Sequence, residues 1–64
     1  SLDSTNPDYV LNLAISLDKI GQYATALDFY NVAIALAQHA TVKFDLSSVN
    51  DRIQILNQVV AKAL

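Results

Sequence analysis

The sequence contains no cysteine, and its 64 residues include only one glycine, one proline and one histidine. Without cysteine the chain can form neither disulfides nor thiolate metal sites, and it has no thiol nucleophile. One glycine is too few for the glycine-rich loops that cradle phosphate groups. The single histidine, His39, has no second histidine or cysteine nearby with which to hold a metal ion. We therefore expect no metal ion and no cofactor.

Candidate catalytic groups are equally sparse. Ser47 and Ser48 have no plausible histidine and acid partners for a nucleophilic triad, and a capping role explains both. Asp18 and Asp28 fall on different predicted helices at solvent-facing positions, so they do not form a carboxylate pair for acid–base chemistry. His39, near a helix end, suits a cap or a solvent role. We expect the chain not to be an enzyme, and no residue is predicted to be catalytic.

Positive charge is also scarce, and the formal net charge at pH 7 is −2. The four basic residues are scattered along the chain: Lys19, Lys43, Arg52 and Lys62. No basic stripe is available to release counterions from a phosphate backbone, so nucleic acid is not an expected partner. No apolar run approaches the roughly 20 residues that cross a bilayer, so we expect no direct membrane insertion.

Hydrophobic residues, in contrast, make up 53% of the chain. A domain of this size buries only about 60% of the surface that its unfolded chain exposes, so some apolar surface should stay exposed. We interpret the excess as a face toward missing repeats or toward a partner, with scattered exposed side chains as the alternative. Because the chain starts at Ser1 and not at Met, we also expect it to be a fragment of a larger protein.

The apolar spacing predicts an all-α fold. After a tail at 1–6, Asn6 caps a first helix from Pro7 to about Lys19. Gly21 is predicted to end it as a left-handed cap, and the chain then turns into an antiparallel second helix from Tyr23 to about His39. Alanines at contact spacing, Ala26 and Ala33 facing Ala14, predict a close approach of these two helices. Larger side chains are expected to fill the space beside the alanines: Tyr23, Phe29 and Tyr30.

The periodicity breaks after residue 40. Val42, Phe44 and Leu46 alternate as in a strand, but no second strand exists to pair with, so 41–47 is predicted as a loop anchored by buried side chains. Ser48 to Asp51 resembles a capping box with Asp in place of Glu, and it predicts a third helix over 48–64. The apolar face of this helix consists of Val49, Ile53, Leu56, Val60 and Ala63.

The first two helices resemble one tetratricopeptide repeat, a 34-residue helix-turn-helix unit with the pattern W-x2-L-G-x2-Y, A-x3-F and P. The positions that carry the resemblance are Val10, Leu13, Ala14, Leu17, Ala26 and Tyr30, together with Gly21, Tyr23 and Ala33. It covers residues 7–40. Gln38 stands in place of the terminal proline, and Asn57 replaces the small residue in the third helix, which looks like a helix that caps the last repeat.

The resemblance implies an αα-superhelix and a protein-binding scaffold, the C-terminal end of a longer solenoid. The sequence is also loosely similar to the tail of bacterial repeat proteins of pilus biogenesis and secretion. In such solenoids the first helix lines a protein-binding groove, here Asp8, Leu11, Asn12, Ile15, Asp18 and Lys19. Leu11 and Ile15 replace the lysine and asparagine of a carboxylate clamp, so we expect no such clamp. The apolar pair, with Asn12 between, suits an amphipathic helix of another protein, a hydrophobic peptide, or packing by the chain's own third helix. The alternative function is homodimerisation through the exposed apolar face.

Overall fold

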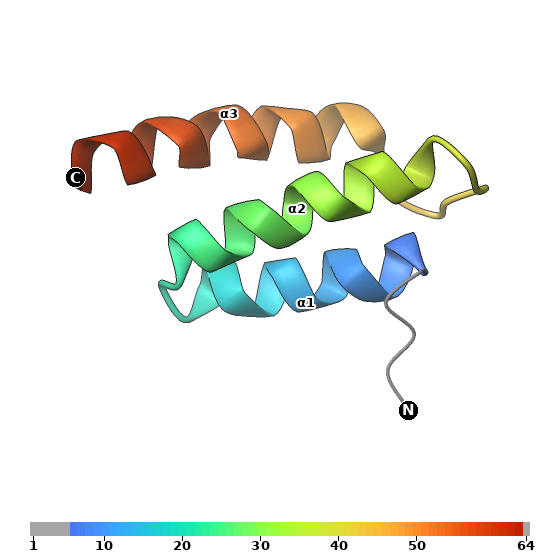
Figure 1. Cartoon of the computed structure of the whole chain (residues 1–64), viewed down its shortest axis with the longest axis horizontal. Helices are drawn as coiled ribbons and strands as arrows, with labels where there is room; N and C mark the ends of the chain where they lie inside the picture. The colour runs from blue at the N-terminus through green and yellow to red at the C-terminus, as the bar shows by residue number, and fades with distance from the viewer. Residues whose placement is uncertain (1–5, 64) are drawn as a thin grey trace.

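The computed structural model describes residues 6–63, which form three helices. These are α1 (Pro7–Lys19), α2 (Tyr23–Ala37) and α3 (Leu46–Ala63), and consecutive helices run antiparallel (Figure 1). No strand occurs among these residues. The predicted all-α fold with a helical hairpin followed by a third helix is confirmed. The predicted tail at 1–6 lies, apart from Asn6, outside the described residues, as does Leu64.

Both ends of α1 are fixed by the residues predicted to fix them. The Asn6 side-chain oxygen accepts hydrogen bonds from the backbone N–H groups of Asp8 and Tyr9, at 2.9 and 3.3 Å. Beyond the other end, Gly21 adopts a φ of +83°, in the left-handed region that favours glycine. The N–H of Gly21 donates to the carbonyl of Asp18, and the N–H of Gln22 donates to that of Leu17. This is a Schellman motif, which satisfies the last carbonyls and reverses the chain.

The alanine positions allow α1 and α2 to pack closely. Ala14, Ala26 and Ala33 are all fully buried, which confirms the predicted contact between the two helices. Tyr30 fills the space beside them and is 4% exposed, but Tyr23 is 39% exposed, so the prediction that Tyr23 packs into this contact is wrong. The complete buried core consists of Val10, Leu11, Ala14, Ala26, Tyr30, Ala33, Val49, Ile53 and Leu56.

The second and third helices differ from the prediction at their ends. α2 stops at Ala37, because the N–H groups of Gln38 and His39 donate to carbonyls only three residues back, which tightens the last turn. α3 begins at Leu46, and its cap is Asp45. The Asp45 carboxylate accepts the Ser47 N–H and the Ser48 hydroxyl, each at 3.0 Å. The predicted capping box at Ser48 and the loop boundary at 47 are therefore wrong, since Asp45 offers an acceptor earlier in the chain.

The connection from 38 to 45 is a loop, as predicted, and half-buried Phe44 packs against the core; Val42 is half-buried as well. Leu46, the third member of the alternating set, is instead the exposed first residue of α3.

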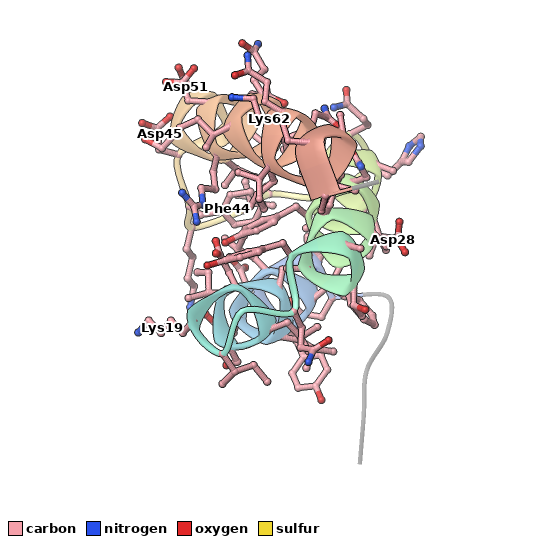
Figure 2. All side chains as sticks on the ribbon, turned by 90° about the vertical axis from the view of Figure 1, so that its left-hand side faces the viewer. Lys19, Asp28, Phe44, Asp45, Asp51 and Lys62 are labelled. Carbon is pink, nitrogen blue, oxygen red and sulfur yellow. The ribbon has the colours of Figure 1, made fainter. Side chains whose placement is uncertain are left out.

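α2 is the central helix, packing against α1 on one side and α3 on the other. No α-carbon of α1 lies within 8 Å of an α-carbon of α3. Viewed along the helices, α1 and α3 stand on the same side of α2 and enclose an angle between them (Figure 2). Side chains, rather than close backbone packing, therefore connect α1 to α3 across the space that the two helices enclose, which we call the inner face.

Candidate protein-binding face

The carboxylate of Asp18 connects all three helices. Arg52 of α3 donates to it twice, from Nε to Oδ2 at 2.8 Å and from an Nη to Oδ1 at 2.6 Å. The hydroxyl of Tyr30, from α2, donates to the same Oδ2 at 2.9 Å. A bidentate arginine–carboxylate pair is geometrically specific and stronger than a neutral hydrogen bond. The three residues, which we call the Asp18 cluster, therefore fix the angle between α1 and α3.

The environment of the Asp18 cluster shifts the pKa values of its members. The hydrogen bonds from Arg52 lower the pKa of Asp18 below its usual value, although burial acts in the opposite direction. The hydrogen bonds to Asp18 likewise raise the pKa of Arg52. Burial, with the Asp18 carboxylate beside it, raises the pKa of the Tyr30 phenol to about 12. At neutral pH the cluster is an ion pair with a neutral phenol, a structural arrangement with no proton poised for transfer.

The Asp18 cluster corrects the sequence-based prediction. Asp18 was expected at a solvent-facing position like Asp28, but its side chain is 12% exposed, whereas Asp28 is exposed. Sequence spacing could not identify Arg52 as its partner, because the two residues lie 34 positions apart on helices whose relative placement depends on the loop. The buried position of Tyr30 was predictable, and a buried phenol needs a hydrogen-bond acceptor.

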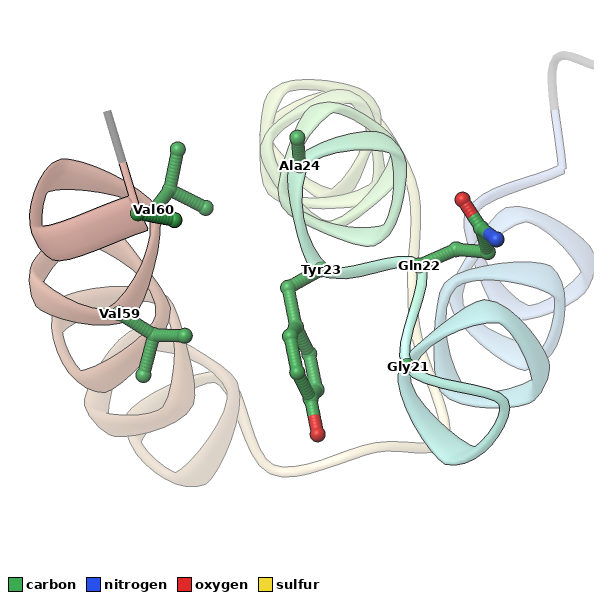
Figure 3. Close-up of a pocket in the computed structure, with 7 residues that line it drawn as sticks. Gly21, Gln22, Tyr23, Ala24, Val59 and Val60 are labelled. Atoms are coloured by element: carbon green, nitrogen blue, oxygen red, sulfur yellow. The ribbon is translucent and has the colours of Figure 1, made fainter.

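Exposed apolar side chains lie next to the Asp18 cluster. Arg52, Ile55 and Val59 follow one another at spacings of three and four, which places them on one face of α3. Ile55 is 51% exposed and Val59 is 37% exposed. From the start of α2, the ring of Tyr23 points into the space between α3 and α1 (Figure 3).

A pocket of about 300 Å³ opens between the start of α2 and the end of α3 (Figure 3). It is lined by Gly21, Gln22, Tyr23, Ala24, Val59, Val60 and Ala63. The described lining residues are mostly apolar, and none of them carries a carboxylate or an amine. Its volume is at the lower limit of small-molecule sites, roughly 300 to 1,000 Å³, and suits an apolar side chain. We call it the α2–α3 pocket.

The six residues predicted to line a groove on the first helix do not form one surface. Asp8, Leu11 and Asn12 line a second pocket, of about 400 Å³, together with Lys43 and Phe44 of the loop. Leu11 is 6% exposed and belongs to the core. Ile15 is half-buried against the core, Asp18 is held by Arg52, and Lys19 is exposed. A role of these residues in binding stays a prediction.

Charged side chains lie at both ends of the described part of the molecule. Lys19 and Lys62 lie in the last turns of α1 and α3, at the end where α2 begins. Asp8 lies in the first turn of α1, and Asp45 caps α3, at the opposite end. Lys43, in the loop, lies at this opposite end as well, and Asp18 and Arg52 form an ion pair between α1 and α3.

Among residues 6–63, no three His, Asp or Glu side chains gather where they could hold a metal ion. No helix in this part of the chain is both long and apolar enough to cross a membrane.

Comparison of the chain with protein-family models, with curated proteins and with solved structures finds no match. The likeness to a tetratricopeptide repeat therefore rests on the residue pattern quoted above. The positions that would be its core, Val10, Ala14, Ala26, Tyr30 and Ala33, are buried here. Any helical hairpin with a close contact would bury residues at this spacing, so the family stays a prediction.

Proposed function

We propose that the chain is a protein-binding module and that its binding surface is the inner face around Tyr23, Ile55 and Val59. The proposal is carried by one observation: Tyr23 and Val59 are exposed and line the same apolar pocket, and exposed Ile55 lies on the same face of α3 as Val59. Contiguous exposed apolar surface with polar residues at its edge is typical of interaction sites. The aromatic ring of Tyr23 adds a side chain that is enriched at such interfaces.

The tetratricopeptide-like pattern supports a more specific proposal. α3 would cap the last repeat of a longer solenoid, with the binding surface at its C-terminal end. The looser similarity to bacterial proteins of pilus biogenesis and secretion suggests a role in a surface-assembly machine.

A photo-crosslinking side chain at position 59 tests the proposal. The protein that carries it would be irradiated in its native cells, and crosslinked products would be identified by mass spectrometry. The matched control places the same group at Val32, an exposed valine of α2 that lines neither pocket. We expect one defined partner to crosslink at 59 and not at 32. Equal crosslinking at the two positions would contradict a binding surface around Val59.

Self-association is the second candidate, because exposed Ile55 and Val59 on one helix face could equally pair two copies. In that case the crosslinked product at position 59 would be a homodimer. The same product would form with the purified chain alone, at a yield that rises with its concentration.

A further inference from the structure

We propose that the face of the α1–α2 hairpin under α3 is a receptor for amphipathic helices. Within the chain α3 occupies this face, and a helix of another protein with the same pattern of side chains can displace it. The face differs from the surface of the proposed function, which includes exposed residues of α3 itself. The inference is drawn from the residues through which α3 contacts the hairpin, from its limited attachment and from the Asp18 cluster.

The first step is the pattern of the contact. The residues of α3 that contact the hairpin stand at positions i, i+3, i+4 and i+7: Val49, Arg52, Ile53 and Leu56. The three apolar members are buried in one core with Leu11 of α1 and Tyr30 of α2, and Arg52 pairs with Asp18. Amphipathic helices that bind in grooves of other proteins use this same spacing. We call these four residues the docking stripe.

The second step is the limited attachment of α3. Its buried side chains end at Leu56, and of residues 57–63 only Val60 is half-buried. At this end the α2–α3 pocket lies between α3 and the start of α2. No α-carbon of α1 lies within 8 Å of one of α3, whereas α1 and α2 pack closely through their buried alanines. The hairpin contact therefore does not depend on α3, and α3 can detach while α1 and α2 stay packed.

The third step is the chemistry that Asp18 selects. When α3 detaches, the Asp18 carboxylate loses both hydrogen bonds from Arg52 and keeps the one from the Tyr30 hydroxyl. It is then available to another donor. A guanidinium, unlike an ammonium, can bond both carboxylate oxygens in a fixed geometry. The displacing helix therefore carries arginine at the second position of the docking stripe and apolar side chains at the other three.

The loop sets the terms of the competition. Its end is attached to α1, because the Lys43 N–H donates to Asp8 Oδ1 at 3.2 Å and Phe44 packs against the core. Since α3 begins at Leu46, it stays near its site even when detached. Such a short connection gives an effective concentration on the order of millimolar. A separate helix displaces α3 at lower concentration only if it binds more tightly or if the contact of α3 is weakened.

Hydrogen exchange of the native chain tests whether α3 detaches by itself. Because α3 opens without the hairpin, the backbone amides of Ile53 and Leu56 should exchange at least about tenfold faster than those of Ala14 and Ala33. Equal exchange at the four amides would show that α3 opens only when the whole chain unfolds, which would overturn the inference.

Displacement tests the receptor. An unlabelled peptide of residues 45–63, acetylated and amidated, is titrated into the ¹⁵N-labelled Arg52→Gln chain and followed by nuclear magnetic resonance. We expect the α3 signals of the chain to move to the positions of an unfolded segment while those of α1 and α2 stay dispersed. The native chain should need about tenfold more peptide. A matched control, Lys62→Gln, removes an exposed charge outside the docking stripe and should behave as the native chain does.

Variants of the peptide test the docking stripe. Ile55→Asp changes an exposed isoleucine and should leave displacement unchanged, whereas Ile53→Asp changes a buried one and should abolish it. Arg52→Gln in the peptide should weaken displacement about tenfold. Circular dichroism checks that each chain variant is folded, and the native chain at higher peptide concentration gives the same test if Arg52→Gln is not.

These results are separable from those of the proposed function, because a partner can crosslink at position 59 whether or not a helix displaces α3. Two results of the titration would overturn the inference. One is failure of the native peptide to displace α3 from either chain, and the other is an equal effect of Ile53→Asp and Ile55→Asp.

Discussion

At the scale of single residues, the side chain of Asp18 links α1 to both other helices through hydrogen bonds. Its carboxylate accepts three hydrogen bonds, from Arg52 and Tyr30, while its own backbone belongs to α1. A carboxylate that is mostly buried is tolerated only when its oxygens are occupied in this way. The energetic consequences of the Asp18 cluster are therefore best observed where its members gain or lose protons.

The stability of the fold should fall at both extremes of pH. The folded-state pKa of Asp18 is lowered, so its contribution is fully present above the unfolded value of 3.8 and is lost as the pH falls through the folded value. The folded-state pKa of Tyr30 is raised from 10.0 to about 12, so its contribution is present below pH 10.0 and is lost as the pH rises toward 12.

Urea unfolding of the native chain and of Tyr30→Phe, followed from pH 2 to 12, measures both effects. At neutral pH the variant should lose about 1 kcal/mol with the hydrogen bond. Its further loss of stability between pH 10.0 and 12 should be smaller than that of the native chain. Identical alkaline profiles would show that Tyr30 does not carry this dependence.

Gly21 is the second residue whose role can be isolated. A side chain added there would meet no atom within 4 Å, so only the backbone conformation, with φ at +83°, opposes substitution. Gly21→Ala should lower the free energy of unfolding by about 1 to 2 kcal/mol. Gly21→Asn should cost less, because asparagine tolerates this conformation. Equal losses for the two variants would argue against a purely conformational cost.

At the scale of elements, the distance between α1 and α2 depends on alanine. Ala33 is fully buried, whereas Ala35, on the same helix, is exposed. Ala33→Leu should destabilise the fold by about 1 to 3 kcal/mol, because the added atoms force the helices apart. Ala35→Leu should change the stability by less than about 0.5 kcal/mol. Thermal unfolding of both variants tests the contact, and an equally stable Ala33→Leu chain would contradict it.

The start of α3 gives a separate test of capping. Asp45→Ala should cost about 1 kcal/mol, because the Ser47 N–H and the Ser48 hydroxyl lose their acceptor. Asp51→Ala, which would disrupt the capping box predicted from the sequence, should cost less. Urea unfolding measures the loss of unfolding free energy in each variant, and the larger loss identifies the aspartate that caps this helix end.

The elements show how far the sequence determines the fold. The bounds of α1 were predictable, because Asn6, Pro7 and Gly21 each have a strong local conformational preference. The start of α3 was not, because two aspartates near serines offered competing caps. The Asp18 cluster was beyond sequence reasoning: its hydrogen bonds depend on how far α3 lies from α1, and the tertiary packing of α2 sets this distance. Ile55 and Val59, two of the three residues of the proposed binding surface, lie on α3, so their position relative to Tyr23 also depends on this packing.

At the scale of the whole molecule, the large apolar side chains that stay exposed are dispersed. They lie just after α1, on α2 and on α3: Ile20, Tyr23, Val32, Leu46, Ile55 and Val59. Only Tyr23 and Val59 share a pocket, with Ile55 on the same face of α3. A stable dimer buries about 800 Å² on each partner in one patch, and a single pocket of about 300 Å³ with one helix face beside it is a small basis for such an interface.

We therefore expect the chain to be a folded monomer in solution. Sedimentation velocity over a concentration series, with circular dichroism on the same samples, measures the mass and the helicity together. A constant monomer mass with full helicity means that the apolar excess of the sequence is available to a foreign partner. A mass that rises with concentration would favour pairing through α3, and Val59→Ser should then restore the monomer whereas Val32→Ser should not. An unchanged assembly in the Val59→Ser variant would place the self-contact on another surface, away from the α2–α3 pocket.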